Sequence, residues 1–124
     1  MDISFDIQNP IPIKELIVMI DKHDAAGEPI PFSIIAVTCN YAKNTGGEIV
    51  ILEKSIHLKN VRLINLSDIT IKINPYSLPK IPQKLSSRIR RIYNVTDDSI
   101  RNVNIRYITH FKFYHDTSFR RITY

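Results

Sequence analysis

The chain contains only one cysteine and three glycines, and no tryptophan. Cys39 has no second thiol in the chain for an intramolecular disulfide, so the fold must be held by packing alone. We expect Cys39 to be a buried small hydrophobic residue in a reducing compartment. Scarce glycine and frequent isoleucine together favour pleated β structure.

Long hydrophobic runs are also missing. Runs such as Leu16–Ile20 and Ile49–Leu52 are far too short to cross a bilayer, so no transmembrane segment is expected. Met1–Asp6 has neither a basic region nor an apolar core, which predicts that no signal peptide directs secretion. With 124 residues, 44% of them apolar, and no repeat or linker, the sequence predicts a single domain over residues 1–124.

Signatures of catalysis, cofactor binding and metal binding are absent from the sequence. Asn44–Gly47 matches neither glycine-rich phosphate-binding pattern and suits a turn. The four histidines include no pair at metal-ligand spacing on a predicted helix, and one cysteine cannot complete a Cys-rich zinc site. We interpret Asp97–Asp98 as part of a turn or helix cap. The less favoured alternative is a nucleophilic pair of Cys39 with a histidine that is close only in space. The sequence thus predicts no catalytic residue, no cofactor and no metal, and a protein that is not an enzyme.

Alternation of apolar and polar residues predicts strands over most of the chain. Ile3, Phe5 and Ile7 predict a short half-buried strand that ends at Asn9-Pro10. Phe32–Asn40 is apolar on both faces, as is typical of a central strand, and a hairpin loop would join it to its partner. That partner and the remaining predicted strands are Glu48–Lys54, Leu58–Leu66, Ile69–Ile73, Val103–Tyr114 and Phe119–Tyr124.

Two segments have helical spacing. The first is a single apolar stripe, with a stop at Ala25–Gly27, made by Ile13, Leu16, Ile17 and Ile20. Its β-branched residues leave a buried strand as the alternative. Gln83–Tyr93 predicts a short basic amphipathic helix that follows Pro82. The predicted fold is mainly β: an antiparallel β-sandwich, jelly roll or partly open barrel with one or two short helices.

Charge is divided unevenly along the chain. Residues 1–57 carry four Lys/Arg and eight Asp/Glu, whereas residues 58–124 carry thirteen and four, so the net charges are −4 and +9. The basic half predicts a surface for an anionic partner or for the acidic surface of a neighbouring subunit. Four interleaved tyrosines, Tyr93, Tyr107, Tyr114 and Tyr124, would supply rings for single-stranded nucleic acid. The candidate basic patch consists of Lys84, Arg88, Arg90, Arg91, Arg106, Lys112, Arg120 and Arg121.

Two segments carry a resemblance to other proteins. Pro31–Asn40 followed by Asn44–Ile49 resembles a strand-loop-strand of small uncharacterised proteins of bacteriophages and mobile elements, and the segment from Val103 onward resembles the ends of the same proteins. The resemblance implies a phage or mobile-element origin and transfers no activity.

Composition and resemblance together predict a structural role. We expect a non-catalytic structural subunit of a bacteriophage particle or similar assembly, which binds other protein subunits as a homo- or hetero-oligomer. Its expected location is the virion or the host cytoplasm. The alternative is a small basic nucleic-acid-binding protein of a phage or mobile element.

Overall fold

The computed structural model of the chain describes residues 3–37, 48–58, 63–65, 70–72 and 88–124. Two helical elements lie in these ranges, the α-helix α1 (Ile13–Ile20) and the 3-10 turn η3 (Ile105–Tyr107). A small two-stranded sheet contains β4 (Leu63–Asn65) and β5 (Thr70–Lys72). The main sheet contains β1 (Ser4–Pro12), β2 (Phe32–Val37), β3 (Ile49–His57), β6 (Ile89–Asn94), β7 (Ser99–Asn104), β8 (Ile108–Phe113) and β9 (Ser118–Thr123).

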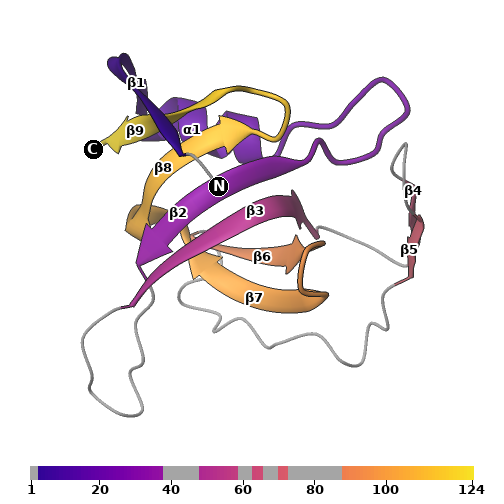
Figure 1. The fold of residues 1–124 in the computed structure, drawn as a ribbon. Coiled ribbons are helices and arrows are strands. Elements are labelled where there is room, and N and C mark those ends of the chain that lie inside the picture. The colour runs from indigo at the N-terminus through magenta and orange to yellow at the C-terminus, as the bar shows by residue number, and fades with distance from the viewer. Residues whose placement is uncertain (1–2, 38–47, 59–62, 66–69, 73–87) are drawn as a thin grey trace.

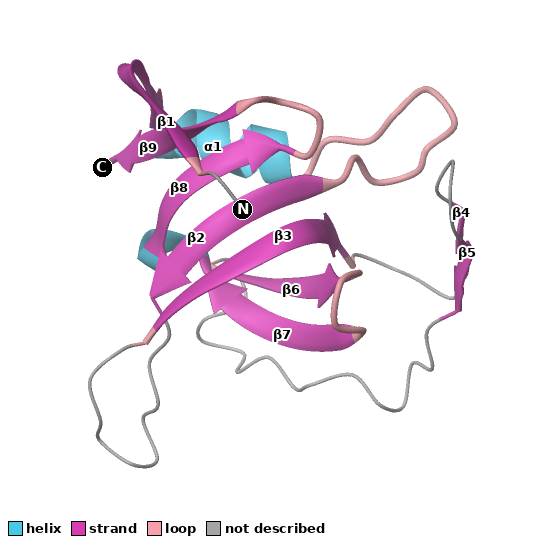
Figure 2. Ribbon diagram, in the orientation of Figure 1, coloured by secondary structure: helices cyan, strands magenta, loops and turns pink. Residues whose placement is uncertain are grey.

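The main sheet has the strand order β1-β9-β8-β2-β3-β6-β7 (Figure 1). It is strongly curved, and its described strands do not close into a barrel (Figure 2). The sheet is mixed, because β1 pairs parallel to β9 while the other neighbours pair antiparallel. The mainly β prediction is confirmed.

One face of the main sheet, the inner face, packs against α1 (Figure 1). Leu16 and Ile20 lie one helical turn apart on α1 and are buried against alternate residues of the strands. The predicted helix is therefore confirmed, and the alternative of a buried strand is wrong. The core on this face consists of Ile11, Leu16, Ile20, Phe32, Ile34, Ala36, Leu52, Ile92, Val103, Ile105, Ile108, Phe111 and Ile122.

The predicted central strand and the predicted C-terminal hairpin are confirmed within the described residues. β2 has β3 on one side and β8 on the other, with Ile34 opposite both Leu52 and Phe111. β8 and β9 form the hairpin that encloses the turn predicted at His115–Ser118. Two features lie outside the described residues, namely Cys39 and the loop that contains Asn44–Gly47.

The predicted helix over Gln83–Tyr93 is wrong where the structure describes it. Ile89–Asn94 is strand β6, which pairs antiparallel with β3 and with β7. The apolar stripe that suggested a helix also fits a strand over this short length, and the β-branched and aromatic residues Ile89, Ile92 and Tyr93 suit a pleated sheet. Hydrogen-bonded pairing with a neighbour on each side shows that this segment follows the strand period and not the helical one.

The predicted continuous strand Val103–Tyr114 is also wrong. It is divided into β7, η3 and β8, and the two strands do not pair with each other. The side chain of Asn104 accepts a hydrogen bond from the backbone N–H of Arg106, which starts the 3-10 turn. This corner carries the chain from one edge of the sheet to β8, the neighbour of β2.

β1 differs from its prediction in two ways. It continues through Pro10 to Pro12, which an edge strand tolerates because its outward N–H groups need no partner in the sheet. Its alternating apolar face is not half-buried: Phe5 is 50% exposed and Ile7 is 88% exposed. The residue that joins the core is Ile11, after an irregularity in the pairing with β9.

Candidate binding surfaces

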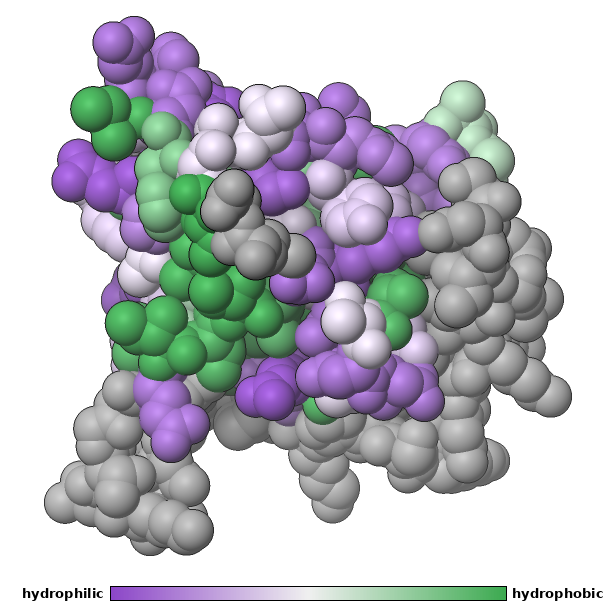
Figure 3. Space-filling view, viewed as in Figure 1, coloured by the Kyte–Doolittle hydropathy of each residue, from purple (hydrophilic) through white to green (hydrophobic). Residues whose placement is uncertain are grey.

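The outer face of the sheet carries apolar side chains at the end where β2 stops and β3 begins. The cross-strand pairs Ile35–Ile51 and Val37–Ile49 lie there. Ile49 is 74% exposed and Ile51 is 43% exposed, although both belong to a strand with a buried inner face. Figure 3 shows hydrophobic surface gathered on this part of the molecule. We call these four residues the β2–β3 apolar patch.

A hollow of about 460 Å³ lies beside this patch, between β1 and the β8–β9 hairpin. Three rings meet in it. The ring centroid of Phe5 is 5.1 Å from that of His110 in an edge-to-face arrangement, and 6.1 Å from that of Phe119. We call it the aromatic hollow; its lining residues are Phe5, Asp6, Ile7, His110, Phe119 and Arg121.

The charged groups of the aromatic hollow are Asp6 and Arg121. The Asp6 carboxylate accepts hydrogen bonds from the side chain of Asn9 and the backbone N–H of Gln8, and these bonds hold the pKa of Asp6 below its usual value. Arg121 makes no ion pair or hydrogen bond through its guanidinium with the described part of the chain. Burial, and secondarily the charge of Arg121, lowers the pKa of His110, so its ring is neutral near pH 7.

A second hollow, of about 510 Å³, lies between α1 and η3. Its floor is apolar, and Arg88 and Arg106 line it without an ion pair to any described residue. Tyr124 closes one side, because its hydroxyl lies within hydrogen-bond distance of the backbone carbonyls of Arg106 (2.6 Å) and Ile108 (2.7 Å) and donates its one hydrogen to this pair of acceptors. We call it the rim hollow; its lining residues are Ile13, Ile17, Arg88, Ile105, Arg106 and Tyr124.

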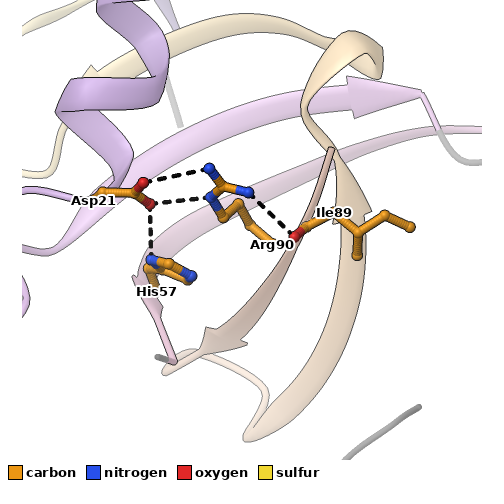
Figure 4. Close-up of polar contacts among 4 residues, drawn as sticks. All are labelled: Asp21, His57, Ile89 and Arg90. Carbon is orange, nitrogen blue, oxygen red and sulfur yellow. Dashed lines mark hydrogen bonds and ion pairs between the residues drawn. The ribbon is translucent and has the colours of Figure 1, made fainter. Parts of the chain in front are cut away.

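A cluster of polar contacts joins three elements at the C-terminal end of α1 (Figure 4). Oδ1 of Asp21, the C-cap of α1, lies 2.9 Å from His57 Nδ1 and accepts a hydrogen bond from Arg90 Nε at 3.1 Å. Arg90 Nη2 donates a second hydrogen bond, to Asp21 Oδ2, at 3.3 Å. Both carboxylate oxygens are thus used within the fold, so this Asp21 cluster ties α1 to β3 and β6.

The seven residues of the predicted basic patch that the structure describes do not form one patch. Arg88 and Arg106 meet in the rim hollow, whereas Arg121 lies in the aromatic hollow. Lys112 is near the latter, with its ammonium group 5.6 Å from the centroid of Phe119. Lys84 lies outside the described residues.

The remaining three arginines are held by the fold or partly covered. Arg90 is paired with Asp21, and Arg120 donates from Nε to the carbonyl of Asn9 at 2.6 Å, which fastens β9 to β1. Arg91 is half-buried on β6. These three side chains therefore contribute to the packing of the sheet and do not line one common ligand surface.

The tyrosines are divided in the same way. Tyr93 is buried and its hydroxyl bonds to the carboxylate of Asp98; burial first, and Asp98 second, raise the pKa of Tyr93 to about 12. The ring centroid of Tyr114 lies 4.9 Å from the ammonium group of Lys54 and 5.9 Å from that of Lys112. Tyr107 is half-buried on η3.

Sequence reasoning missed two sites. Phe5 and Ile7 were predicted to lie on the buried face of a half-buried strand, because alternation shows that a strand has an apolar face without showing what covers it. The Asp21 cluster joins residues as far apart as Asp21 and Arg90, 69 positions along the chain, and no local spacing could reveal it.

Within the described ranges, no three His, Cys, Asp or Glu side chains gather as a metal site would require. No helix in the same part of the chain has the length and apolar character to span a membrane. Comparison with known proteins found no matching family, no matching curated protein and no matching solved structure.

Proposed function

We propose that the chain is a non-catalytic structural subunit of a multi-subunit assembly, a bacteriophage particle or a similar one, and that it binds a neighbouring copy of itself through the β2–β3 apolar patch. The observation that carries this proposal is the exposure of Ile49 and Ile51 on the outer face of the sheet, beside Ile35, which is itself only 8% exposed. Contiguous apolar surface on a soluble domain is typical of protein interfaces. The inner-face core of the same strands is complete without these side chains.

A neighbouring copy is the favoured partner because one exposed carboxylate of the chain has the charge to meet the arginines of the rim hollow of another copy. The turn between α1 and β2 exposes Asp24 at the end where Phe32 pairs with Phe113, the end near which Lys22, Lys54 and Lys112 also lie. At the opposite end, Arg88 and Arg106 line the rim hollow. A copy placed head to tail would bring its Asp24 to these arginines.

The β2–β3 apolar patch lies at the same end of the sheet as the arginines. Val37 and Ile49 are the last pair of β2 with β3, and Arg106 lies two residues before Ile108, the first residue of β8, which pairs with Ala36. One neighbour would therefore contact both surfaces. Because such a contact joins two different patches, it builds a ring or a filament and not a closed two-fold dimer.

Sedimentation velocity across a concentration series tests this proposal. The wild-type chain should form species larger than a dimer, and Ile49→Lys should shift the midpoint of association at least tenfold toward higher concentration. Val18→Lys is the matched control, because Val18 is 67% exposed on α1 outside the patch. Arg106→Glu should also weaken association, and the loss should shrink as salt rises.

The outcomes separate clearly. A wild-type chain that stays monomeric at high concentration would contradict self-assembly, and so would equal losses in Ile49→Lys and Val18→Lys. Far-UV circular dichroism and thermal unfolding of each variant would show whether the fold is kept, since all three side chains are on the surface.

A further inference from the structure

The aromatic hollow has the chemistry of a site for a planar ligand. Phe5 is half exposed on an edge strand, and its ring stands edge-to-face to His110 and tilted by 35° to Phe119. Aromatic faces left open to solvent are the platforms on which unpaired nucleobases stack. Ile7, also exposed, extends the apolar wall along β1.

Cations lie beside the rings. The Arg121 guanidinium is in the hollow without an ion-pair partner in the described chain, and Lys112 is held next to Phe119 by donating to the carbonyls of Tyr114 (3.1 Å) and Asp116 (3.0 Å). A row of cations along a line of rings would follow the phosphates of a single strand whose bases stack on the rings.

Asp6 gives the hollow a second kind of selectivity. Its carboxylate is an acceptor only, so it favours a ligand edge that offers N–H groups and repels a phosphate placed against it. Adenine and cytosine present an exocyclic amino group, whereas thymine presents none. The ligand would therefore place an amino-bearing base at Asp6 and its phosphate at Arg121.

We propose that the aromatic hollow binds single-stranded nucleic acid, with an amino-bearing base stacked on Phe5 near Asp6 and the adjoining phosphates on Arg121 and Lys112. This activity goes beyond the assembly role and rests on different residues. A free nucleotide shares the chemistry of one base and one phosphate, but it would reach only one of the two cations. The strand is the preferred source because Lys112 lies two residues beyond His110 along β8, on the same face of the sheet.

Fluorescence anisotropy with labelled single-stranded dA6, titrated with the full chain at a series of salt concentrations, tests the proposal. Phe5→Leu keeps an apolar side chain without a ring and should weaken binding about tenfold. Arg121→Gln should lower the slope of log affinity against log salt by about one unit. Arg101→Gln removes the same charge from an exposed position on β7, at the opposite edge of the sheet, and should leave the slope unchanged.

Ligand series complete the test. Binding of dA6 and dC6 should exceed binding of dT6, and dA6 should exceed adenosine monophosphate because a strand reaches both cations. Absence of dA6 binding at low salt would overturn the proposal, as would equal effects of Arg121→Gln and Arg101→Gln or equal affinity for dA6 and dT6. If Phe5→Leu does not fold, the Arg121→Gln slope still decides, because Arg121 is exposed. The assembly proposal is untouched by failure here, since its test uses Ile49 and Arg106.

Discussion

The two faces of the main sheet are built from the same strands and differ in what their apolar residues contact. On β3, Leu52 faces inward and is buried in the core, whereas its neighbour Ile51 and the nearby Ile49 face outward and are exposed. On the neighbouring β8, Phe111 is buried inside, while His110 lines the aromatic hollow outside. The comparison shows that the inner residues form the core, whereas the outer face leaves Ile49 and Ile51 exposed to solvent.

Phe111→Ala should have the largest effect on stability. Phe111 is fully buried, stacks on Phe32 at 5.4 Å and contacts Phe113 edge-to-face, so its removal leaves a cavity in the inner core. We expect a loss of about 3–5 kcal/mol in the free energy of unfolding. The matched change on the outer face, Ile49→Ala, should cost less than about 1 kcal/mol. Urea denaturation of both variants measures the difference, and similar losses would remove the distinction between the faces.

Asp21→Ala should have the next largest effect. It leaves the His57 ring and the Arg90 guanidinium, both largely buried, without the carboxylate that they share. We expect a loss of about 1–3 kcal/mol. Asp116→Ala, at an exposed turn, is the control and should change stability by less than about 0.5 kcal/mol. An equally mild result for Asp21→Ala in thermal denaturation would mean that the cluster does not hold α1 to the sheet.

Tyr93→Phe should cost about 1 kcal/mol at neutral pH, because it removes the hydroxyl bond to Asp98. The fold raises the pKa of Tyr93 from 10.0 to about 12, so the neutral phenol is favoured in the folded state. This contribution is complete below pH 10 and is lost as pH rises from 10 toward 12. The wild type should therefore lose more stability than Tyr93→Phe over that interval in a pH series of urea titrations. Parallel losses would contradict the assignment.

His110 should produce the smallest effect, at mildly acidic pH. Its pKa in the fold is below 6.5, mainly through burial, so the unfolded chain takes up the proton first as pH falls. Stability should be complete above pH 6.5 and decline below it. His110→Gln has no titrating ring and should show a shallower decline between pH 6.5 and 5. A steeper decline in the variant would show that protonated His110 stabilises the outer face.

Short sequence patterns correctly predicted the elements whose formation depends mainly on residues close together in the chain. The i, i+3, i+4, i+7 stripe from Ile13 to Ile20 predicted α1, and the polar residues His115–Ser118 predicted the β8–β9 turn. The segment Phe32–Asn40, apolar on both faces, predicted a central strand, because such a pattern is typical of strands that are covered on both faces, and its described part, Phe32–Val37, is the central strand β2.

Features that depend on long-range pairing were not predictable from the sequence. The apolar residues of β6 fit both the helical period and the strand period. The pairing of Tyr93 with Ile56 on β3 stabilises the strand. The basic residues were close in sequence on a supposed helix, but adjacent positions on a strand point to opposite faces, which separated Arg90 from Arg91. Exposure of Phe5 and Ile7 follows from the position of β1 at the sheet edge, which the sequence does not encode locally.

Methyl NMR with a soluble paramagnetic probe tests most directly whether the outer face is a binding surface while the inner face is the core. In dilute solution the probe should attenuate the Ile49, Ile51 and Val18 signals and spare Ile34, in line with their exposure. As the concentration rises into the range of self-association, Ile49 and Ile51 should become protected while Val18 stays attenuated. Continued attenuation of Ile49 and Ile51 in the associated species, or protection of Val18 in their place, would contradict the account.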